Sequence, residues 1–189
     1  MYMMSMKYLY VKSIGTVERE VIEYVGAAVS SQFALPCRLI EDTTYPLFAF
    51  EPRRNQYYAK DIIKHLSTDL PSDCDKMVGI TDVDLCTPVL TFVYGEAQLG
   101  GSVAVVSLKR LRQEFYHLPR NDTVLCERII KECVHELGHC HGLFHCCNHK
   151  CVMCFSSSIV SIDNKESTFC IGCTEFLHER MRKEYHEQI

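Results

Sequence analysis

One stretch constrains this chain more than any other, the run HELGHCHGLFH at positions 135–145, which has the pattern H-E-x-x-H-x-x-G-x-x-H. Residues four apart lie on one face of a helix, so His135 and His139 can offer imidazole nitrogens to one metal ion. Gly142 can end the helix with a positive φ, and the turn then brings His145 back as a third ligand. Three nitrogen ligands with a fourth position left for water are typical of a catalytic zinc site.

Glu136 directly follows the first of these histidines. Its carboxylate can reach a metal-bound water and take its proton, as the general base of a hydrolase does. The hydroxide then attacks a carbonyl that zinc polarises, and Glu136 delivers the proton to the departing amine. The sequence therefore predicts a zinc-dependent metallopeptidase that hydrolyses peptide bonds.

Two pairs of cysteines follow the histidine motif. They are Cys146 and Cys151, and after a loop Cys170 and Cys173 in a C-x-x-C. This spacing is typical of a tetrahedral four-thiolate zinc site, which is saturated and therefore structural. Several neighbouring side chains could compete for zinc, namely Cys140, His141, Cys147, His149 and Cys154. Cys147 could replace Cys146 by a small backbone turn, but the spacing favours Cys146.

The run H-E-x-x-H-x-x-G-x-x-H-C-x4-C, with a methionine soon after it and a later C-x-x-C, resembles the archaemetzincins, a branch of the metzincin zinc peptidases. The motif block covers residues 135–173. The resemblance implies catalytic zinc on His135, His139 and His145, with Glu136 as general base and Met153 as the Met-turn beneath them. It also implies a second, structural zinc on Cys146, Cys151, Cys170 and Cys173. The expected cofactors are thus two zinc ions per chain.

Length and charge limit the number of domains and the kinds of partner that this chain can have. The 189 residues suit one domain with a real core, and the formal charge of −4 provides no basic field for nucleic acid or membrane. Seven of the twelve cysteines crowd between Cys140 and Cys173, which favours metal binding over disulfides. Lys7 interrupts the apolar N-terminal stretch Met1–Leu9, so no signal peptide is expected. A cytoplasmic location is predicted.

The pattern of strands and helices indicates an α/β fold. Five strands are expected at residues 7–11, 36–40, 77–81, 89–94 and 103–108, and helices at 17–32, with Thr16 as N-cap, and at 58–66. The first strand, helix and strand form a βαβ unit with parallel pairing. Together with the family resemblance, this predicts a metzincin-like, mixed and mostly parallel five-stranded twisted sheet.

The substrate is expected to be a peptide or protein that adds to an edge strand of this sheet. The strand Leu90–Tyr94 is favoured as that edge. Arg53 and Arg54 could bind a carboxylate, although a solvated basic loop is the simpler interpretation. Glu132 could either support a metal-bound histidine or lie in solvent.

Two subdomains are expected. Residues 1–142 form an N-terminal α/β unit that includes the active-site helix, with an apolar face from Leu125 to Leu137. Residues 143–189 are too few for a core of their own, so a structural zinc would supply folding free energy there. A final helix is expected at 174–187. Exopeptidase and endopeptidase activity both remain open, as do hydrolysis of a small acyl-amine and a catalytically latent zinc-binding scaffold.

Overall fold

A five-stranded sheet forms the centre of the fold, which a computed structural model describes over residues 6–186. The strands lie in the order β2 (Cys37–Ile40), β1 (Tyr8–Ile14), β5 (Cys74–Thr81), β8 (Val103–Ser107) and β7 (Gly95–Ala97). The first three pairings are parallel, and β7 pairs antiparallel with β8. The mixed, mostly parallel five-stranded sheet expected from the sequence is therefore confirmed.

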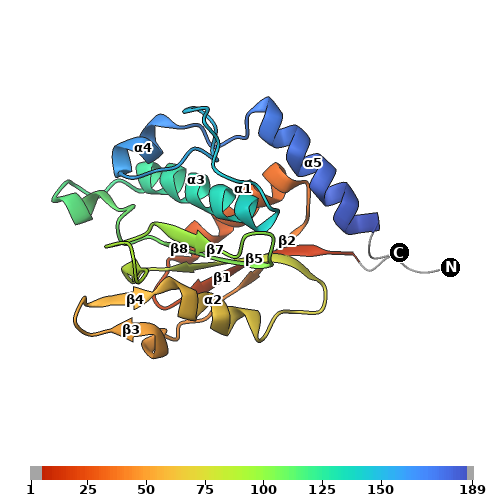
Figure 1. The fold of residues 1–189 in the computed structure, drawn as a ribbon. Helices are drawn as coiled ribbons and strands as arrows, with labels where there is room; N and C mark the ends of the chain where they lie inside the picture. The colour runs from red at the N-terminus through yellow and green to blue at the C-terminus, as the bar shows by residue number, and fades with distance from the viewer. Residues whose placement is uncertain (1–5, 187–189) are drawn as a thin grey trace.

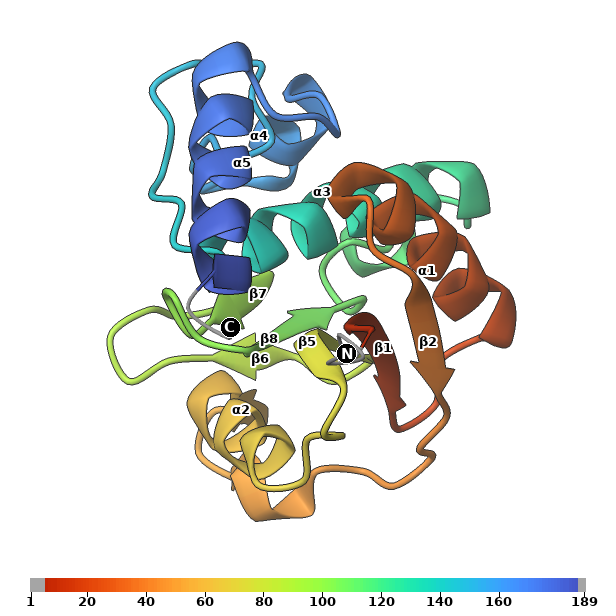
Figure 2. The same cartoon turned by 90° about the vertical axis from the view of Figure 1, so that its right-hand side faces the viewer.

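Helices cover both faces of this sheet (Figures 1 and 2). One face carries α1 (Arg19–Phe33) and α3 (Asp122–Cys140), and the opposite face carries α2 (Ala59–Ser67). Of two further helices, α4 (Ile159–Asn164) lies on the far side of α3 from the sheet, and α5 (Ile171–His186) begins there and runs past the end of α3 towards the sheet. Short elements complete the chain: η1 (Leu47–Ala49), η2 (Gln113–Tyr116), and a small second sheet of β3 (Phe50–Glu51), β4 (Gln56–Tyr58) and β6 (Leu85–Cys86). The small sheet and α4 were not expected from the sequence.

Helices α1 and α3 begin in different ways. Helix α3 begins after Asn121, whose side chain caps it by accepting a hydrogen bond from the backbone N–H of Val124 at 3.1 Å. Helix α1 begins after Glu18 rather than after Thr16, and no side chain caps it. The Glu18 carboxylate instead accepts two hydrogen bonds from Arg112, which fixes the helix start from outside.

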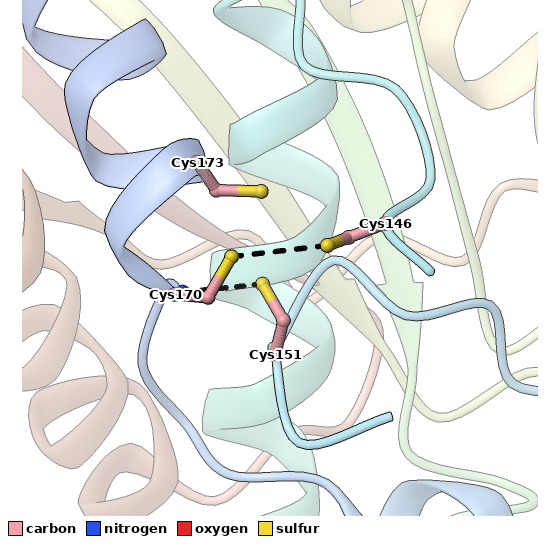
Figure 3. A group of neighbouring side chains, drawn as sticks. All are labelled: Cys146, Cys151, Cys170 and Cys173. Carbon is pink, nitrogen blue, oxygen red and sulfur yellow. Dashed lines mark hydrogen bonds between the residues drawn. The ribbon is translucent and has the colours of Figure 1, made fainter. Parts of the chain in front are cut away.

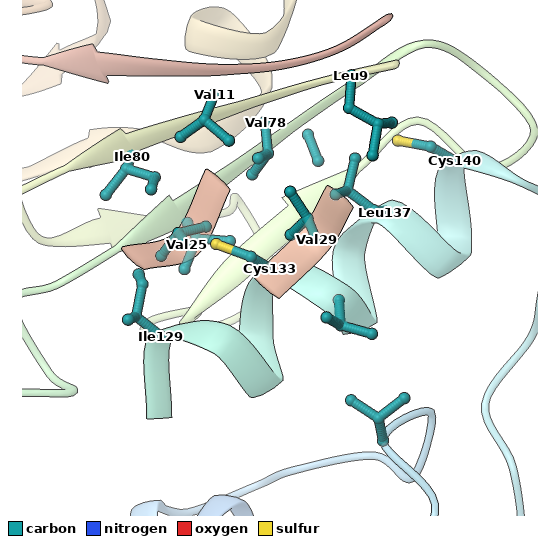
Figure 4. Close-up of a cluster of buried hydrophobic side chains, with 14 of the residues drawn as sticks. Leu9, Val11, Val25, Val29, Val78, Ile80, Ile129, Cys133, Leu137 and Cys140 are labelled. Carbon is teal, nitrogen blue, oxygen red and sulfur yellow. The ribbon is translucent and has the colours of Figure 1, made fainter. Parts of the chain in front are cut away.

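The active-site helix is held by the larger of two cores, which lies between the sheet and the helices α1 and α3 (Figure 4). Ile129, Cys133 and Leu137 of α3 point towards α1 and the strands β1 and β5 and are fully or almost fully buried. Burial of a side chain of this size stabilises the fold by about 1.5–3 kcal/mol. This apolar stripe fixes the rotation of α3, and so decides which of its faces is turned towards the cleft.

The edge of the sheet differs from the prediction. The stretch Leu90–Tyr94 is not a strand, apart from a single bridge between Val93 and Leu85, and the edge strand is β7, which starts one residue later. Arg54 explains the difference, because its guanidinium donates hydrogen bonds of 2.7 Å to three carbonyls of this loop, those of Thr87, Leu90 and Thr91. These carbonyls are directed at the Arg54 guanidinium instead of at the N–H groups of a neighbouring strand. Both interpretations of Arg54 as a carboxylate binder or a solvated charge are therefore wrong.

None of the twelve cysteines, all of which lie in the described part of the chain, forms a disulfide. Within residues 6–186 no helix has both the length and the apolar character that crossing a membrane requires. Most of the stretch Met1–Leu9, for which no signal peptide was expected, lies outside the described residues.

Candidate active site

Three histidines meet at one end of α3. His135 and His139 come from the last turns of the helix, and His145 comes from the loop that follows it. One ring nitrogen of each lies within 4.8 Å of those of the other two. Gly142 makes this return possible with a φ of +85°, where a Cβ would also lie only 3.2 Å from the Arg180 guanidinium. The structure thus brings together the three histidines that the motif singled out.

Hydrogen bonds to the backbone orient the two helical imidazoles. The Nδ1 of His135 lies 2.8 Å from the Val152 carbonyl, and the Nδ1 of His139 lies 2.7 Å from the Leu143 carbonyl. A carbonyl can only accept, so each Nδ1 carries the proton and each Nε2 exposes a lone pair. These two Nε2 atoms face each other at 3.1 Å. Two lone pairs held so close fit a shared cation, and the residues therefore suit a metal ion.

The protonation state of the histidines also favours metal binding. Burial lowers the pKa of His135 well below its ordinary value, and the nearby positive charge of Lys165 lowers it further. Burial likewise lowers the pKa values of His139 and His145. At neutral pH the imidazoles are neutral, which is the form that ligates a metal.

Glu136 lies in the wall of the same cleft, beside His135 and His139. Burial raises the pKa of the Glu136 carboxyl well above its ordinary value, and the nearby Glu132 carboxylate raises it further. A carboxyl with a raised pKa holds a proton more readily, which suits a group that must accept one and pass it on. The Glu136 side chain rests against Gly95 of the edge strand, where an added Cβ would lie 2.7 Å from its Cγ.

The cleft in front of these residues has a volume of about 600 Å³. One wall is formed by the loop from Thr87 and the edge strand β7, and the other by Phe144 and the segment 155–157. The phenyl ring of Phe155 lies 5.1 Å from the His145 ring. Four of the lining side chains are large, apolar and exposed: Leu90, Leu99, Phe144 and Phe155. The cleft is open to solvent and has apolar walls.

Met153 lies directly beneath the histidines. It is fully buried, and its sulfur would be 2.5 Å from a Cβ added to Gly138, which lies between His135 and His139 in the motif. The methionine therefore packs on the helix at the one position of this turn that has no side chain. The role of Met153 as a Met-turn, which the family resemblance implies, stays a prediction.

The four cysteines also converge (Figure 3). The sulfur atoms of Cys146, Cys151, Cys170 and Cys173 all lie within 4.8 Å of one another. Backbone N–H groups donate to three of these sulfurs. Asn148 donates to the Cys146 sulfur at 3.4 Å, and Cys170 donates to the Cys151 sulfur at 3.3 Å. The backbone N–H of Cys173 donates to Cys170 and lowers the pKa of that thiol to about 7, whereas burial raises the pKa values of Cys151 and Cys173. N–H donors stabilise thiolates, so this group too could hold a metal.

The competing side chains lie elsewhere. Cys140 is buried in the core, and the ring of His141 stacks on Phe33 with centroids 5.2 Å apart. Cys147 is exposed, and Cys154 lies 3.8 Å from the Nδ1 of His149. Among the described residues, none of these five belongs to either group of converging ligand atoms.

Two features near the site were missed by sequence reasoning. Glu132 neither supports a histidine nor lies in solvent, because it is buried and pairs with Lys165 at 2.9 Å. Gly95 abuts Glu136 and gives the carboxylate its space. A single lysine in a loop and a single glycine beside a strand carry no signal in sequence, so only the tertiary structure reveals these contacts.

Comparison with known proteins decides the family. The model of peptidase family M54 matches residues 1–179. The chain belongs to peptidase family M54. This M54 chain is 38% identical over 170 residues to an archaemetzincin from Methanocaldococcus jannaschii, covering 90% of this chain and 92% of that one. The family resemblance read from the motif is confirmed, and the M54 chain is a zinc metallopeptidase, a hydrolase of peptide or protein substrates.

Solved structures agree with this assignment. The crystal structure of an archaemetzincin from Methanopyrus kandleri matches the M54 chain with a TM-score of 0.83 and 32% identity, covering 94% of this chain and 97% of that one. A zinc-dependent peptidase from Methanocorpusculum labreanum matches with a TM-score of 0.80 and 31% identity, covering 89% and 99% respectively. The M54 chain therefore has the archaemetzincin fold over nearly its whole length.

Proposed function

We propose that this chain hydrolyses peptide bonds with a zinc ion held by His135, His139 and His145 and with Glu136 as general base. One observation carries the proposal, namely that three imidazole nitrogens converge beside a buried carboxyl in the wall of an open cleft. Zinc bound there would lower the pKa of a water molecule and polarise the substrate carbonyl.

Glu136 handles the proton in this proposal. Its carboxylate takes a proton from the attacking water and then donates it to the nitrogen of the departing amine. Its position against Gly95 brings it close to the backbone of the edge strand. The base therefore lies between the histidines and the strand along which a substrate would bind.

The edge strand β7 suits an extended peptide. The N–H of Ser107 donates to the Tyr94 carbonyl at 2.8 Å, and the N–H of Gln98 donates to the Val103 carbonyl at 3.0 Å. Alternate residues of an antiparallel strand bond to the same neighbour, so the N–H and C=O groups of Gly95 and Ala97 are directed away from β8. We propose that the substrate pairs with these groups as an additional strand.

We further propose a second, structural zinc on Cys146, Cys151, Cys170 and Cys173. Four thiolates saturate a tetrahedral ion and leave no position for substrate. In this proposal residues 143–189 form a C-terminal subdomain braced by that zinc, and residues 1–142 form the α/β subdomain. The chain would then hold two zinc ions of different purpose.

A peptide digest tests the proposed function. The purified chain should contain two zinc ions by elemental analysis and should cleave members of a mixed peptide library, with the products identified by mass spectrometry. A chelator should abolish the cleavage, and added zinc should restore it, because the three histidines supply no nucleophile without the metal. The positions of the cut bonds would separate exopeptidase from endopeptidase activity. Two bound zinc ions without any cleavage would instead support the latent scaffold.

Substitution of Gly95 by alanine should lower kcat without unfolding the protein. The new Cβ would lie 2.7 Å from the Cγ and 2.8 Å from the Oε1 of Glu136, so the carboxylate must move. A misplacement of about 1 Å can lower a rate by about 10²-fold. The measurement is kcat on a peptide that the wild type cleaves, together with the melting temperature.

A matched control is Gly172→Ala, where the added Cβ meets nothing within 4 Å. This variant should cleave at the wild-type rate. If Gly95→Ala also kept the wild-type kcat, the position of the Glu136 carboxylate would not limit the reaction.

A further inference from the structure

A buried ion pair lies behind the active site. The ammonium of Lys165 lies 2.9 Å from the Oε1 of Glu132, and the two side chains are only 1% and 4% exposed. Removing both charges from water is costly, and apolar residues of similar volume are often at least as stable in such places. Stability alone therefore does not account for this pair.

The pair connects two parts of the site. Glu132 lies on α3, one turn before Glu136, and Lys165 immediately follows α4. The Lys165 ammonium also lies 3.5 Å from the carbonyl oxygen of Cys154, the residue after Met153. From Cys154 the chain continues into Phe155, which lies against the His145 ring and lines the cleft.

Lys165 and Glu132 are not among the described residues that line the cleft, so neither side chain contacts a substrate there. We infer that Lys165 and Glu132 are positioning residues, which fix the segment 154–157 against the active-site helix and so set one wall of the cleft. This inference rests on the proposed function for its effect on turnover, but its structural effect can be measured independently.

The chain contains a matched control for this pair. Arg128 lies one turn before Glu132 on α3, and its guanidinium forms two hydrogen bonds of 2.7 Å with the Asp163 carboxylate of α4. This second pair joins α3 to α4 itself, two residues before Lys165. Among the hydrogen bonds in the described part of the chain, the Arg128 side chain makes none to the segment 154–157. Weakening the Arg128–Asp163 pair therefore tests whether any weaker contact between α3 and α4 changes the segment 154–157 and the turnover in the same way.

The experiment compares the double variant Glu132→Leu/Lys165→Met with Asp163→Asn and with the wild type. The double variant leaves no buried charge unpaired, so it should fold and retain two zinc ions. We expect hydrogen exchange at the amides of residues 154–157 to become at least about tenfold faster, because the segment opens more often once its contact with Lys165 is lost. We expect kcat on a wild-type substrate peptide to fall by about 10- to 100-fold. Asp163→Asn should change neither quantity.

Each outcome has a definite meaning. Wild-type exchange at residues 154–157 in the double variant would overturn the inference whatever its kcat, because the two lost charges also act on the pKa values of Glu136 and His135. Equal changes in Asp163→Asn would overturn it as well. If circular dichroism shows that the double variant is unfolded, Glu132→Gln, which keeps the shape of the side chain, should show the same faster exchange, and its failure to do so also overturns the inference. If the wild type cleaves no peptide, the proposed function fails, and the exchange rates still decide whether the pair positions the segment.

Discussion

Replacement of Glu136 by glutamine should lower kcat/KM by about 10²–10⁴-fold, the usual contribution of a general base. Glutamine has nearly the same shape, so the histidines and the edge strand should remain in place. It cannot accept the proton of the attacking water, because its amide is not basic. The loss should appear in kcat, since the interaction is made only during the reaction. Peptide cleavage and the zinc content of the same sample provide the measurement.

The control for this variant is Glu127→Gln, because Glu127 is an exposed glutamate on the same helix. It should cleave like the wild type. A Glu136→Gln protein that retained two zinc ions and cleaved at the wild-type rate would show that another group moves the proton.

Substitution of Cys146 by serine should remove one zinc ion and lower the melting temperature by about 10–20 °C. The reason is that metal binding at a structural thiolate site contributes directly to the free energy of folding. A loss on the order of 5 kcal/mol corresponds to such a shift for a chain of this size. Zinc content by elemental analysis and thermal unfolding by circular dichroism would measure both effects.

Cys147→Ser is the matched control, because Cys147 is the neighbouring residue and is exposed in the structure. It should retain two zinc ions and the wild-type melting temperature. The reverse result, with zinc lost from Cys147→Ser and retained by Cys146→Ser, would exchange the two cysteines as ligands and contradict the arrangement in Figure 3.

The convergence of the histidines could be predicted from sequence because it depends on local geometry. Two residues four apart on a helix share a face, and a glycine three residues later permits the turn, so the spacing nearly determines where His145 returns. The convergence of the four cysteines was expected for a different reason, because two close pairs separated by a loop are the usual spacing of a four-thiolate zinc site. The parallel part of the sheet followed from the βαβ pattern, which has a strongly preferred handedness.

The features that sequence did not predict depend on contacts between distant residues. The stretch Leu90–Tyr94 is rich in strand-forming residues, yet Arg54, more than thirty positions earlier, bonds to its carbonyls and keeps it irregular. Lys165 and Glu132 are 33 positions apart and meet only because α4 packs on α3. No local propensity encodes such pairs, so tertiary structure overrides the strand preference.

His145 and Cys146 are consecutive in the chain, although each belongs to a different group of converging ligands. Under the proposed zinc assignments, this adjacency means that loss of one ion has different consequences from loss of the other. If the ion leaves the three histidines, the four thiolates still hold the loop that carries His145. The histidine site would then keep its geometry and could bind zinc again. Loss of the thiolate-bound ion would release the loop and withdraw His145 with it. Oxidation of the cysteines would therefore stop peptide hydrolysis without acting on the histidine site itself. Zinc lost from the histidines could instead be replaced.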